Sequence, residues 1–202
     1  MNILFVCTGN TCRSPMAEAI LRSKIQQGDV RSAGIFAGNG EPLAKNSDLV
    51  LQEIDLQLDH KTSPVNEQIL AWADLILTMT DRHKQTLALQ YPDYQEKYFT
   101  LKEYVLLDEQ RWTRLKSLYS RFEEKRSSLL SEYHEKLNDI ELEQKLYQEL
   151  ESEIREIEQL EKSLPDINIS DPFGGNLTTY RNTRDELEEH IDKLVEKLRD
   201  EK

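Results

Sequence analysis

Cys7 and Arg13 lie six positions apart, directly after the short apolar run from Asn2 to Val6. A thiol and a guanidinium at this spacing on a tight loop could bind a phosphoryl dianion and attack its phosphorus. The backbone N–H groups of such a loop can turn inward and bind an anion. Arg13 can hold two phosphate oxygens at once, and the positive field of the loop would favour the thiolate of Cys7, which is the nucleophilic form.

The residues around this pair favour a loop that opens into a helix. Gly9 and Asn10 tolerate unusual backbone angles, and Ser14-Pro15 is typical of a helix start. A helix beginning there would direct its positive end at a bound anion. A lone cysteine is more often an inert buried hydrophobe, but this context favours a phosphate-binding loop. Ser14 could donate a hydrogen bond to the Cys7 thiolate, cap the helix, or do both.

The segment from Cys7 to Ser14 resembles the C-x5-R-S signature of the low-molecular-weight protein tyrosine phosphatases. Within that family it is most similar to the bacterial protein-arginine phosphatases, which carry Thr, here Thr11, where tyrosine phosphatases carry Ile or Leu. A second family element, an Asp-Pro far downstream, is matched by Asp171-Pro172. Further similar stretches are Arg31 to Gly34, Ala73 to Thr80, Phe99 to Tyr104 and the C-terminal helix from Tyr180. Together the resemblance covers residues 1–106 and 166–202.

The resemblance implies a role for each matching residue. Cys7 would attack phosphorus and form a cysteinyl-phosphate, and Arg13 would stabilise the charge of the transition state. Asp171 would protonate the leaving group and then activate water; an Asp-Pro is otherwise a common turn. An acid is needed in any case, because a guanidine leaves poorly unless it is protonated. The expected substrate-binding residues are Thr8, Gly9, Asn10, Thr11, Cys12, Ser14 and Phe173.

Thr11 and Phe173 bear on the substrate. A branched apolar residue in place of Thr11 could pack on a tyrosine ring, whereas a threonine offers a hydroxyl to a guanidinium or to attacking water. Tyrosine phosphatases usually place further aromatic residues after Asp-Pro, and this chain has Phe173 followed by two glycines. Both features favour phosphoarginine over phosphotyrosine, unless Thr11 is merely tolerated.

Three more residues have roles implied by the resemblance. Cys12 could form a disulfide with Cys7 under peroxide or could be a passive loop residue. His60 matches a position that supports the region of Asn10, or it is an exposed histidine at a helix end. Ser32 could join the same network. The spacing of His and Cys suggests no metal site, and no cofactor is expected.

Charge and composition exclude several classes of function. The 202 residues carry a net charge of −12, which argues against nucleic acids and anionic membranes as partners. The sequence has neither an apolar run long enough to cross a bilayer nor the pattern of a signal peptide. Two cysteines form no disulfide framework, and a reactive thiol implies a reducing compartment. We therefore expect a cytoplasmic protein.

Alternating apolar and amphipathic segments predict an α/β domain with a four-stranded parallel sheet and helices on both faces. The site would lie at the carboxyl ends of the strands, where Cys7 stands. This phosphatase domain would comprise residues 1–107 and 165–202. The predicted strands are Asn2 to Val6, Val30 to Ile35, Asp74 to Met79 and Tyr98 to Leu101, and the predicted helices are Pro15 to Gln27, Asn46 to Ile54, Pro64 to Trp72 with Ser63 as its cap, and Thr80 to Gln90.

Residues 108–164 interrupt this domain. The segment up to Ser163 contains no Gly or Pro, is rich in acidic residues, and repeats apolar residues at helical spacing, including Leu115, Leu118 and Ile140. This pattern predicts helix with a narrow seam of coiled-coil type. Because Asp171 must return to Cys7, the chain must double back, and Asn138-Asp139 is the best turn. We expect an antiparallel helical hairpin. It could pack on itself, mediate self-association through 108–163, dock a protein partner, or fold over the site as a lid.

These observations together predict a metal-independent cysteine phosphatase that removes phosphate from phosphoarginine in proteins. Its main alternative is a phosphotyrosine phosphatase with the same residues. An arsenate reductase coupled to thioredoxin would need further cysteines near residues 80–90, where the chain has none. An interaction module with a relic domain would not need Cys7, Arg13 and Asp171 together.

Overall fold

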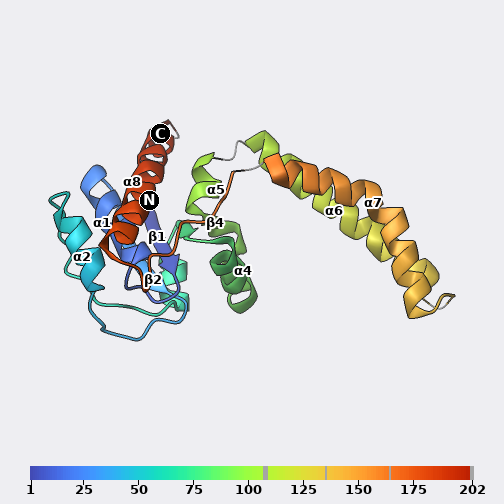
Figure 1. Cartoon of the computed structure of the whole chain (residues 1–202), viewed down its shortest axis with the longest axis horizontal. Coiled ribbons are helices and arrows are strands. Elements are labelled where there is room, and N and C mark those ends of the chain that lie inside the picture. Colours follow the sequence, from blue (N-terminus) through green and yellow to red (C-terminus); the bar gives the residue numbers. More distant parts are fainter. Residues whose placement is uncertain (107–108, 135, 164, 201–202) are drawn as a thin grey trace. The chain divides into compact units, whose positions relative to one another are not determined.

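The computed structural model describes residues 1–106, 109–134, 136–163 and 165–200. Within these residues, β1 (Asn2–Cys7), β2 (Asp29–Gly34), β3 (Leu75–Thr78) and β4 (Tyr98–Thr100) form one sheet in the order β2-β1-β3-β4. Every neighbouring pair is parallel. The predicted α/β class and parallel sheet are confirmed, with strand ends that differ from the predicted ones by at most one residue (Figure 1).

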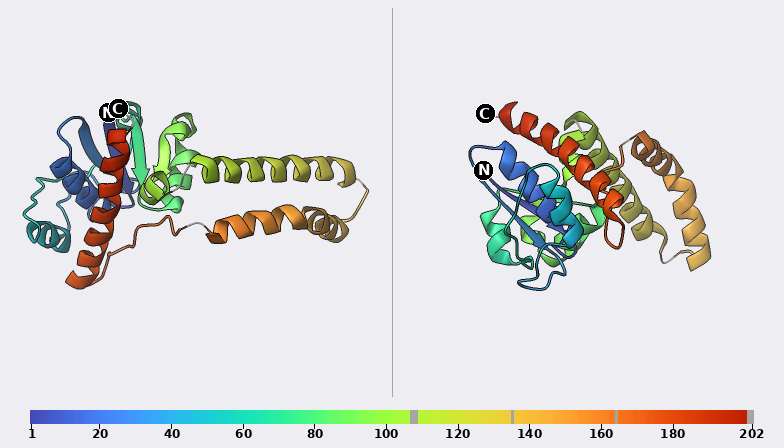
Figure 2. Two further views of the ribbon diagram at one scale, coloured as in Figure 1. Left: turned by 90° about the horizontal axis from the view of Figure 1, so that it is seen from above. Right: turned by 60° about the vertical axis from the view of Figure 1, so that its left-hand side comes forward.

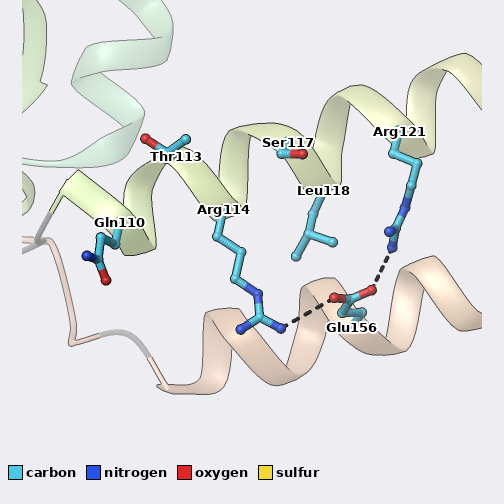
Figure 3. A pocket seen from close by; sticks show the side chains of 7 residues that line it. All are labelled: Gln110, Thr113, Arg114, Ser117, Leu118, Arg121 and Glu156. Atoms are coloured by element: carbon cyan, nitrogen blue, oxygen red, sulfur yellow. Dashed lines mark hydrogen bonds and ion pairs between the residues drawn. The ribbon is translucent and has the colours of Figure 1, made fainter.

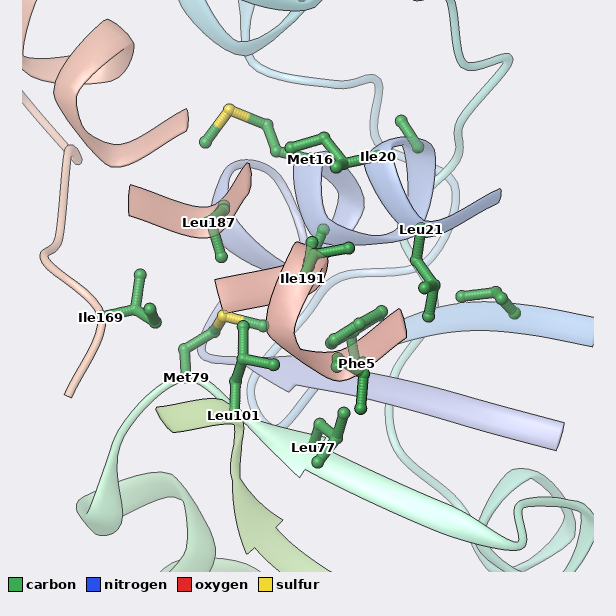
Figure 4. Close-up of a cluster of buried hydrophobic side chains, with 14 of the residues drawn as sticks. Phe5, Met16, Ile20, Leu21, Leu77, Met79, Leu101, Ile169, Leu187 and Ile191 are labelled. Atoms are coloured by element: carbon green, nitrogen blue, oxygen red, sulfur yellow. The ribbon is translucent and has the colours of Figure 1, made fainter. Parts of the chain in front are cut away.

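Helices cover both faces of the sheet, because the buried side chains of β1 alternate between two apolar clusters. Ile3 and Phe5 pack with α1, α2, α5 and α8, whereas Leu4 and Val6 pack with α3, α4 and the 3-10 helix η1. Figure 4 shows Phe5 and Leu77 of the sheet against Leu187 and Ile191 of α8. The helices are α1 (Arg13–Lys24), α2 (Lys45–Gln52), α3 (Glu67–Trp72), α4 (Asp81–Gln90), η1 (Pro92–Lys97), α5 (Leu101–Leu106) and α8 (Leu177–Asp200).

The predicted cap of α3 at Ser63 is wrong. The helix begins at Glu67, and the side chain of Asn66 caps it by accepting a hydrogen bond from the Ile69 N–H. Ser63 and Pro64 instead extend alongside the end of β2, where Pro64 forms a bridge with Gly34. Backbone hydrogen bonds hold this segment extended, since the Gly34 N–H donates to the Ser63 carbonyl and the Val65 N–H donates to the Gly34 carbonyl, both at 2.9 Å.

The chain divides into two compact units, one of Met1–Leu106 with Ile167–Lys202 and one of Leu107–Asp166. The second unit contains α6 (Glu109–Tyr133) and α7 (Asp139–Ser163). Arg121 of α6 bonds Glu156 of α7, and Lys125, further along α6, bonds Glu153. These pairs run in opposite directions along the two helices, so α6 and α7 are antiparallel, as Figure 2 shows.

The seam between α6 and α7 buries Leu115, Leu118, Leu150 and Ile157. The side chain of Asn138 caps α7 by accepting from the Ile140 and Glu141 N–H groups, in agreement with the predicted turn. Ile140 itself is 69% exposed, so its predicted place in the seam is wrong; it lies in the first turn of α7, beyond the end of α6. The predicted ends of this segment, Asp108 and Leu164, lie outside the described residues.

Polar side chains also join the two helices. Arg114 and Arg121 of α6 both reach Glu156 of α7, at 3.5 and 2.6 Å, on a shallow pocket with Leu118 behind them (Figure 3). One carboxylate therefore compensates both guanidinium groups, and this pocket offers a structural rather than a reactive arrangement.

Candidate active site

The loop between β1 and α1 brings Cys7 and Arg13 to the carboxyl edge of the sheet. Cys7 is the last residue of β1, Arg13 is the first residue of α1, and both are buried. The chain turns sharply at Asn10, whose φ of 55° lies in the left-handed region that asparagine tolerates. The loop is fastened to the segment after β2, because the Ile35 N–H donates to the Cys7 carbonyl at 3.0 Å.

Two donors face the sulfur of Cys7. The Ser14 hydroxyl lies 3.0 Å from Sγ, and the Asn10 backbone N–H donates to Sγ at 3.3 Å. Both can stabilise negative charge on sulfur, because a hydrogen bond to the charged form favours that form. The loop and the first turn of α1 therefore supply both of these hydrogen-bond partners of the sulfur.

The Asn10 side chain fixes the direction of the Ser14 hydroxyl. Its Nδ2 donates to Ser14 Oγ at 3.0 Å and to Ser32 Oγ at 2.9 Å, while its Oδ1 accepts from the Ser63 N–H at 2.9 Å. The Ser32 hydroxyl in turn donates a hydrogen bond to the buried carboxylate of Glu18 at 2.6 Å. Because Asn10 already supplies a proton to Ser14 Oγ, the Ser14 proton is left for Cys7 or for the Ala33 carbonyl at 3.4 Å.

Backbone contacts hold the rest of the loop. His60 Nε2 lies 2.7 Å from the Asn10 carbonyl, and the Ala44 N–H donates to the Thr11 carbonyl at 3.0 Å. Gly34, at the end of β2, allows the loop to approach. A methyl group there would lie 2.8 Å from the Thr8 carbonyl oxygen and 2.9 Å from the Asn10 nitrogen.

Asp171 meets the loop from the far end of the sequence. Its Oδ2 pairs with Arg13 Nη2 at 2.8 Å, and its side chain is half exposed while that of Arg13 is buried. The other oxygen, Oδ1, accepts from the Phe173 N–H at 3.2 Å, and the Phe173 ring is 80% exposed. Cysteine, arginine and aspartate therefore converge on one loop, with an aromatic ring on the chain beside them.

The sequence of this chain matches a known family. A model described as "Low molecular weight phosphotyrosine protein phosphatase" matches residues 2–156. The chain belongs to this family.

Three relatives are informative. A protein-arginine-phosphatase from Geobacillus stearothermophilus is 34% identical over 200 residues, which cover 98% of this chain and 97% of that protein. The solved structure of the YwlE arginine phosphatase from the same organism aligns with a TM-score of 0.69 at 33% identity, over 99% of this chain and 94% of that one. A third structure, a Cys-to-Ser mutant of a YwlE arginine phosphatase with a phosphorylated active site serine, aligns with a TM-score of 0.68 at 33% identity, over 98% and 96% of the two chains.

The loop of this low-molecular-weight phosphatase contains a second thiol. Cys12 is buried, its Sγ lies 3.4 Å from the hydroxyl of Tyr180, and both cysteines are free. Burial, followed by the contact with Cys12, raises the pKa of the Tyr180 phenol. Thr11 Oγ1 lies 3.5 Å from the same sulfur, so the threonine hydroxyl contacts the Cys12 side chain within the loop. A redox role for the two thiols stays a prediction.

His83 is a site residue that the sequence reasoning missed. Its Nε2 lies 2.8 Å from Thr8 Oγ1, and its Nδ1 lies 2.9 Å from Thr80 Oγ1. Burial, assisted by the positive charge of Arg13, lowers the pKa of His83 to about 4, so the ring is neutral near pH 7. Glu18, which pairs with Arg22 at 2.8 Å, was missed as well. A helix start of the form Thr-x-x-His, here Thr80 to His83, was the available signal for the histidine.

Among the described residues, no cluster of three or more His, Cys, Asp and Glu is arranged to hold a metal ion. In the same part of the chain, no helix combines the length and apolar character needed to span a membrane.

Proposed function

We propose that this chain is a protein-arginine phosphatase that hydrolyses phosphoarginine through a cysteinyl-phosphate. The observation that carries the proposal is the convergence of Cys7, Arg13 and Asp171 on one loop, with Ser14 directed at the sulfur. The relatives named as arginine phosphatases support it, since they match this chain along nearly its whole length.

In the first step the Cys7 thiolate attacks phosphorus. The S–P bond forms as the P–N bond breaks, and Asp171 donates its proton to the departing guanidine nitrogen. Arg13 and the N–H groups of residues 8–12 hold the phosphoryl oxygens, where charge develops. The phosphorylated serine in the related mutant supports a covalent intermediate at this position.

In the second step water releases the phosphate. Asp171, now a carboxylate, accepts a proton from the water as its oxygen attacks phosphorus. The S–P bond breaks, and Cys7 leaves as a thiolate that accepts hydrogen bonds from the Ser14 hydroxyl and the Asn10 N–H. Inorganic phosphate is the product, and the enzyme returns to its starting state.

Thr11 and Phe173 set the substrate in this proposal. The Thr11 hydroxyl offers a polar contact to a guanidinium or to the attacking water. The exposed Phe173 ring is followed by two glycines and so provides less aromatic surface than a tyrosine slot. The second candidate is a phosphotyrosine phosphatase, which the description of the matching family favours.

The test is the ratio of kcat/KM on phosphoarginine peptides to kcat/KM on phosphotyrosine peptides of the same sequence. We expect phosphoarginine to be preferred and Thr11→Ile to shift the preference toward phosphotyrosine by about tenfold, the scale of one lost polar contact of ~1.4 kcal/mol. An unmodified enzyme that prefers phosphotyrosine would establish the second candidate. A ratio that Thr11→Ile leaves unchanged would remove Thr11 from the account.

For residues 108–163 we infer self-association. The support is a pair of apolar side chains that lie outside the buried seam between α6 and α7, Ile140 and Tyr147, which are 69% and 64% exposed. Light scattering on the full chain tests it, with an Ile140→Glu/Tyr147→Glu double variant and with Leu89→Glu, at an exposed site outside this segment, as control. A species larger than a monomer that only the double variant dissociates is expected. A monomeric parent would contradict self-association, and a double variant with lower activity on a phosphorylated protein would then favour a docked partner.

The site also suits the cytoplasm, because a nucleophilic thiol needs a reducing compartment to stay active. Fractionation of cells that express the full chain, with activity followed in each fraction, tests this part of the proposal. Activity confined to an exported fraction would contradict it.

A further inference from the structure

We propose that Glu186 of α8 is a positioning residue for the general acid, because it fixes the residue that directly precedes Asp171. This inference rests on the proposed function, in which Asp171 delivers a proton to the leaving group. Glu186 bonds Ser170 and Lys102 rather than Cys7 or Arg13, so it would act through the main chain of the Asp171 loop.

Glu186 accepts two hydrogen bonds from Ser170. The Ser170 backbone N–H donates to Glu186 Oε2 at 3.0 Å, and the Ser170 hydroxyl donates to the same oxygen at 2.5 Å. Ser170 Oγ also lies 3.0 Å from the hydroxyl of Thr183, one turn earlier on α8. A carboxylate that binds both the N–H and the side chain of Ser170 fixes the direction in which the chain enters Asp171.

A buried cation holds the carboxylate in turn. Lys102 Nζ of α5 pairs with Glu186 Oε1 at 2.5 Å, and the Lys102 side chain is only 10% exposed. Burial opposes the charge on Glu186, but the hydrogen bonds from Lys102 and Ser170 outweigh it and lower the pKa of this carboxyl. Glu186 is therefore ionised near pH 7, which makes the bonds to Ser170 charge-assisted and strong.

The rest of the loop shows why this point matters. Just before Ser170, the Ile169 N–H donates to the Met79 carbonyl at 2.8 Å, and Ile169 is buried. After Ser170, the Asp171 side chain is half exposed and its contacts are with Arg13 and Phe173. Ser170 is thus the last firmly held residue before the acid. A displacement of about 1 Å at a reacting group can cost on the order of 100-fold in rate.

A purely structural role for the Lys102–Glu186 pair makes a different prediction. If the pair only stabilises the fold, its loss would lower the free energy of unfolding and reduce turnover of every substrate alike. A positioning role affects the step that needs proton delivery, so the loss depends on how well the leaving group departs without a proton.

The experiment compares phosphoarginine, which needs an acid, with p-nitrophenyl phosphate, whose leaving group departs as a stable anion. The parameter is kcat/KM, which reports formation of the cysteinyl-phosphate. Glu186→Ala in the full chain is expected to lose about 10- to 100-fold on phosphoarginine and less than about threefold on p-nitrophenyl phosphate, while the affinity for vanadate stays within about twofold. Glu189→Ala, at an exposed site of the same helix, serves as the matched control and leaves both values unchanged.

Glu186→Gln keeps an oxygen that can accept from Ser170, so it should recover part of the loss, and it carries the same comparison if Glu186→Ala does not fold. Equal losses on the two substrates, or no loss on either, overturn the inference. The variant Asp171→Asn separates failure of the inference about Glu186 from failure of the proposed function. If Asp171→Asn is selective and the Glu186 variants are not, the positioning role alone is wrong. If Asp171→Asn is not selective either, Asp171 is not the acid and both proposals fail.

A double variant provides the last control. If Glu186 acts through Asp171, then Glu186→Ala added to Asp171→Asn should cost little more on phosphoarginine, because coupled residues are not additive. Full additivity of the two losses would overturn the inference.

Discussion

Replacing Asn10 by alanine removes the centre of the hydrogen-bond network under the phosphate loop. The side chain is fully buried and makes three hydrogen bonds, to Ser14, Ser32 and the Ser63 N–H. A hydrogen bond contributes about 0.5 to 1.5 kcal/mol to stability. Loss of three gives a decrease of about 1.5 to 4.5 kcal/mol in the free energy of unfolding.

The backbone at Asn10 adds a smaller effect that a second variant isolates. With a φ of 55°, the residue lies in a region that costs alanine about 1 kcal/mol and costs glycine almost nothing. Asn10→Gly loses the same three hydrogen bonds without this strain. It should therefore be more stable than Asn10→Ala by about 1 kcal/mol, and both should be clearly less stable than the parent.

Scanning calorimetry on the full chain measures these differences. For a chain of this size, 1 kcal/mol moves Tm by about 2 to 4 °C. Asn10→Gly should therefore melt about 3 to 18 °C lower than the parent, and Asn10→Ala, with its added strain, about 5 to 22 °C lower. The transition of the phosphatase unit is the one that vanadate raises, because a ligand stabilises the state that binds it. If both variants melt within about 1 °C of the parent, the network does not support the loop and the reasoning is wrong.

Three further predictions concern the same loop. Cys7→Ser should abolish turnover and still bind vanadate, and turnover that survives would contradict covalent catalysis. Gly34→Ala places a methyl group 2.8 Å from the Thr8 carbonyl, so it should lower the free energy of unfolding by about 1 to 3 kcal/mol; an unchanged denaturant midpoint would show that the loop does not approach β2. The unfolded chain binds a proton at His83 below about pH 6.5 and the folded chain only below about pH 4, so between these values stability rises with pH. Denaturant titrations across that window should show a flatter profile for His83→Gln, and equal profiles would refute the assignment.

Local spacing in the sequence made the loop between β1 and α1 predictable. Cys7, Arg13 and Ser14 are close in sequence, and the order strand, loop, helix leaves few geometries for them. The approach of Ser14 to the Cys7 sulfur at 3.0 Å follows from that order. The parallel sheet was predictable for the same reason, since alternating strands and helices favour right-handed crossovers.

Contacts between distant segments were not predictable from the pattern alone. His83 reads as an ordinary residue in the first turn of a helix, and only the folded chain brings it to Thr8. Glu186 reads as one acid among many on α8, and its partners Ser170 and Lys102 come from two other segments. Only the family resemblance connected Asp171 with Cys7, because an Asp-Pro by itself is a common turn and carries no sign of a catalytic acid.

The contacts of the Asp171 loop explain how the chain accommodates a second compact unit just before its proposed acid. The unit of Leu107–Asp166 ends five residues before Asp171, and closing a longer loop costs only about 0.6 kcal/mol for each doubling of its length. What would disturb the reaction is imprecision at Asp171, and the bonds of Ile169 to Met79 and of Ser170 to Glu186 oppose it. Each of these bonds lies within the unit of Met1–Leu106 and Ile167–Lys202, so the position of the carboxylate is set after the unit of Leu107–Asp166 ends. It follows that changes on the exposed surface of α6 and α7 should leave kcat/KM on small phosphorylated substrates unchanged, whereas the loss of Glu186 should not.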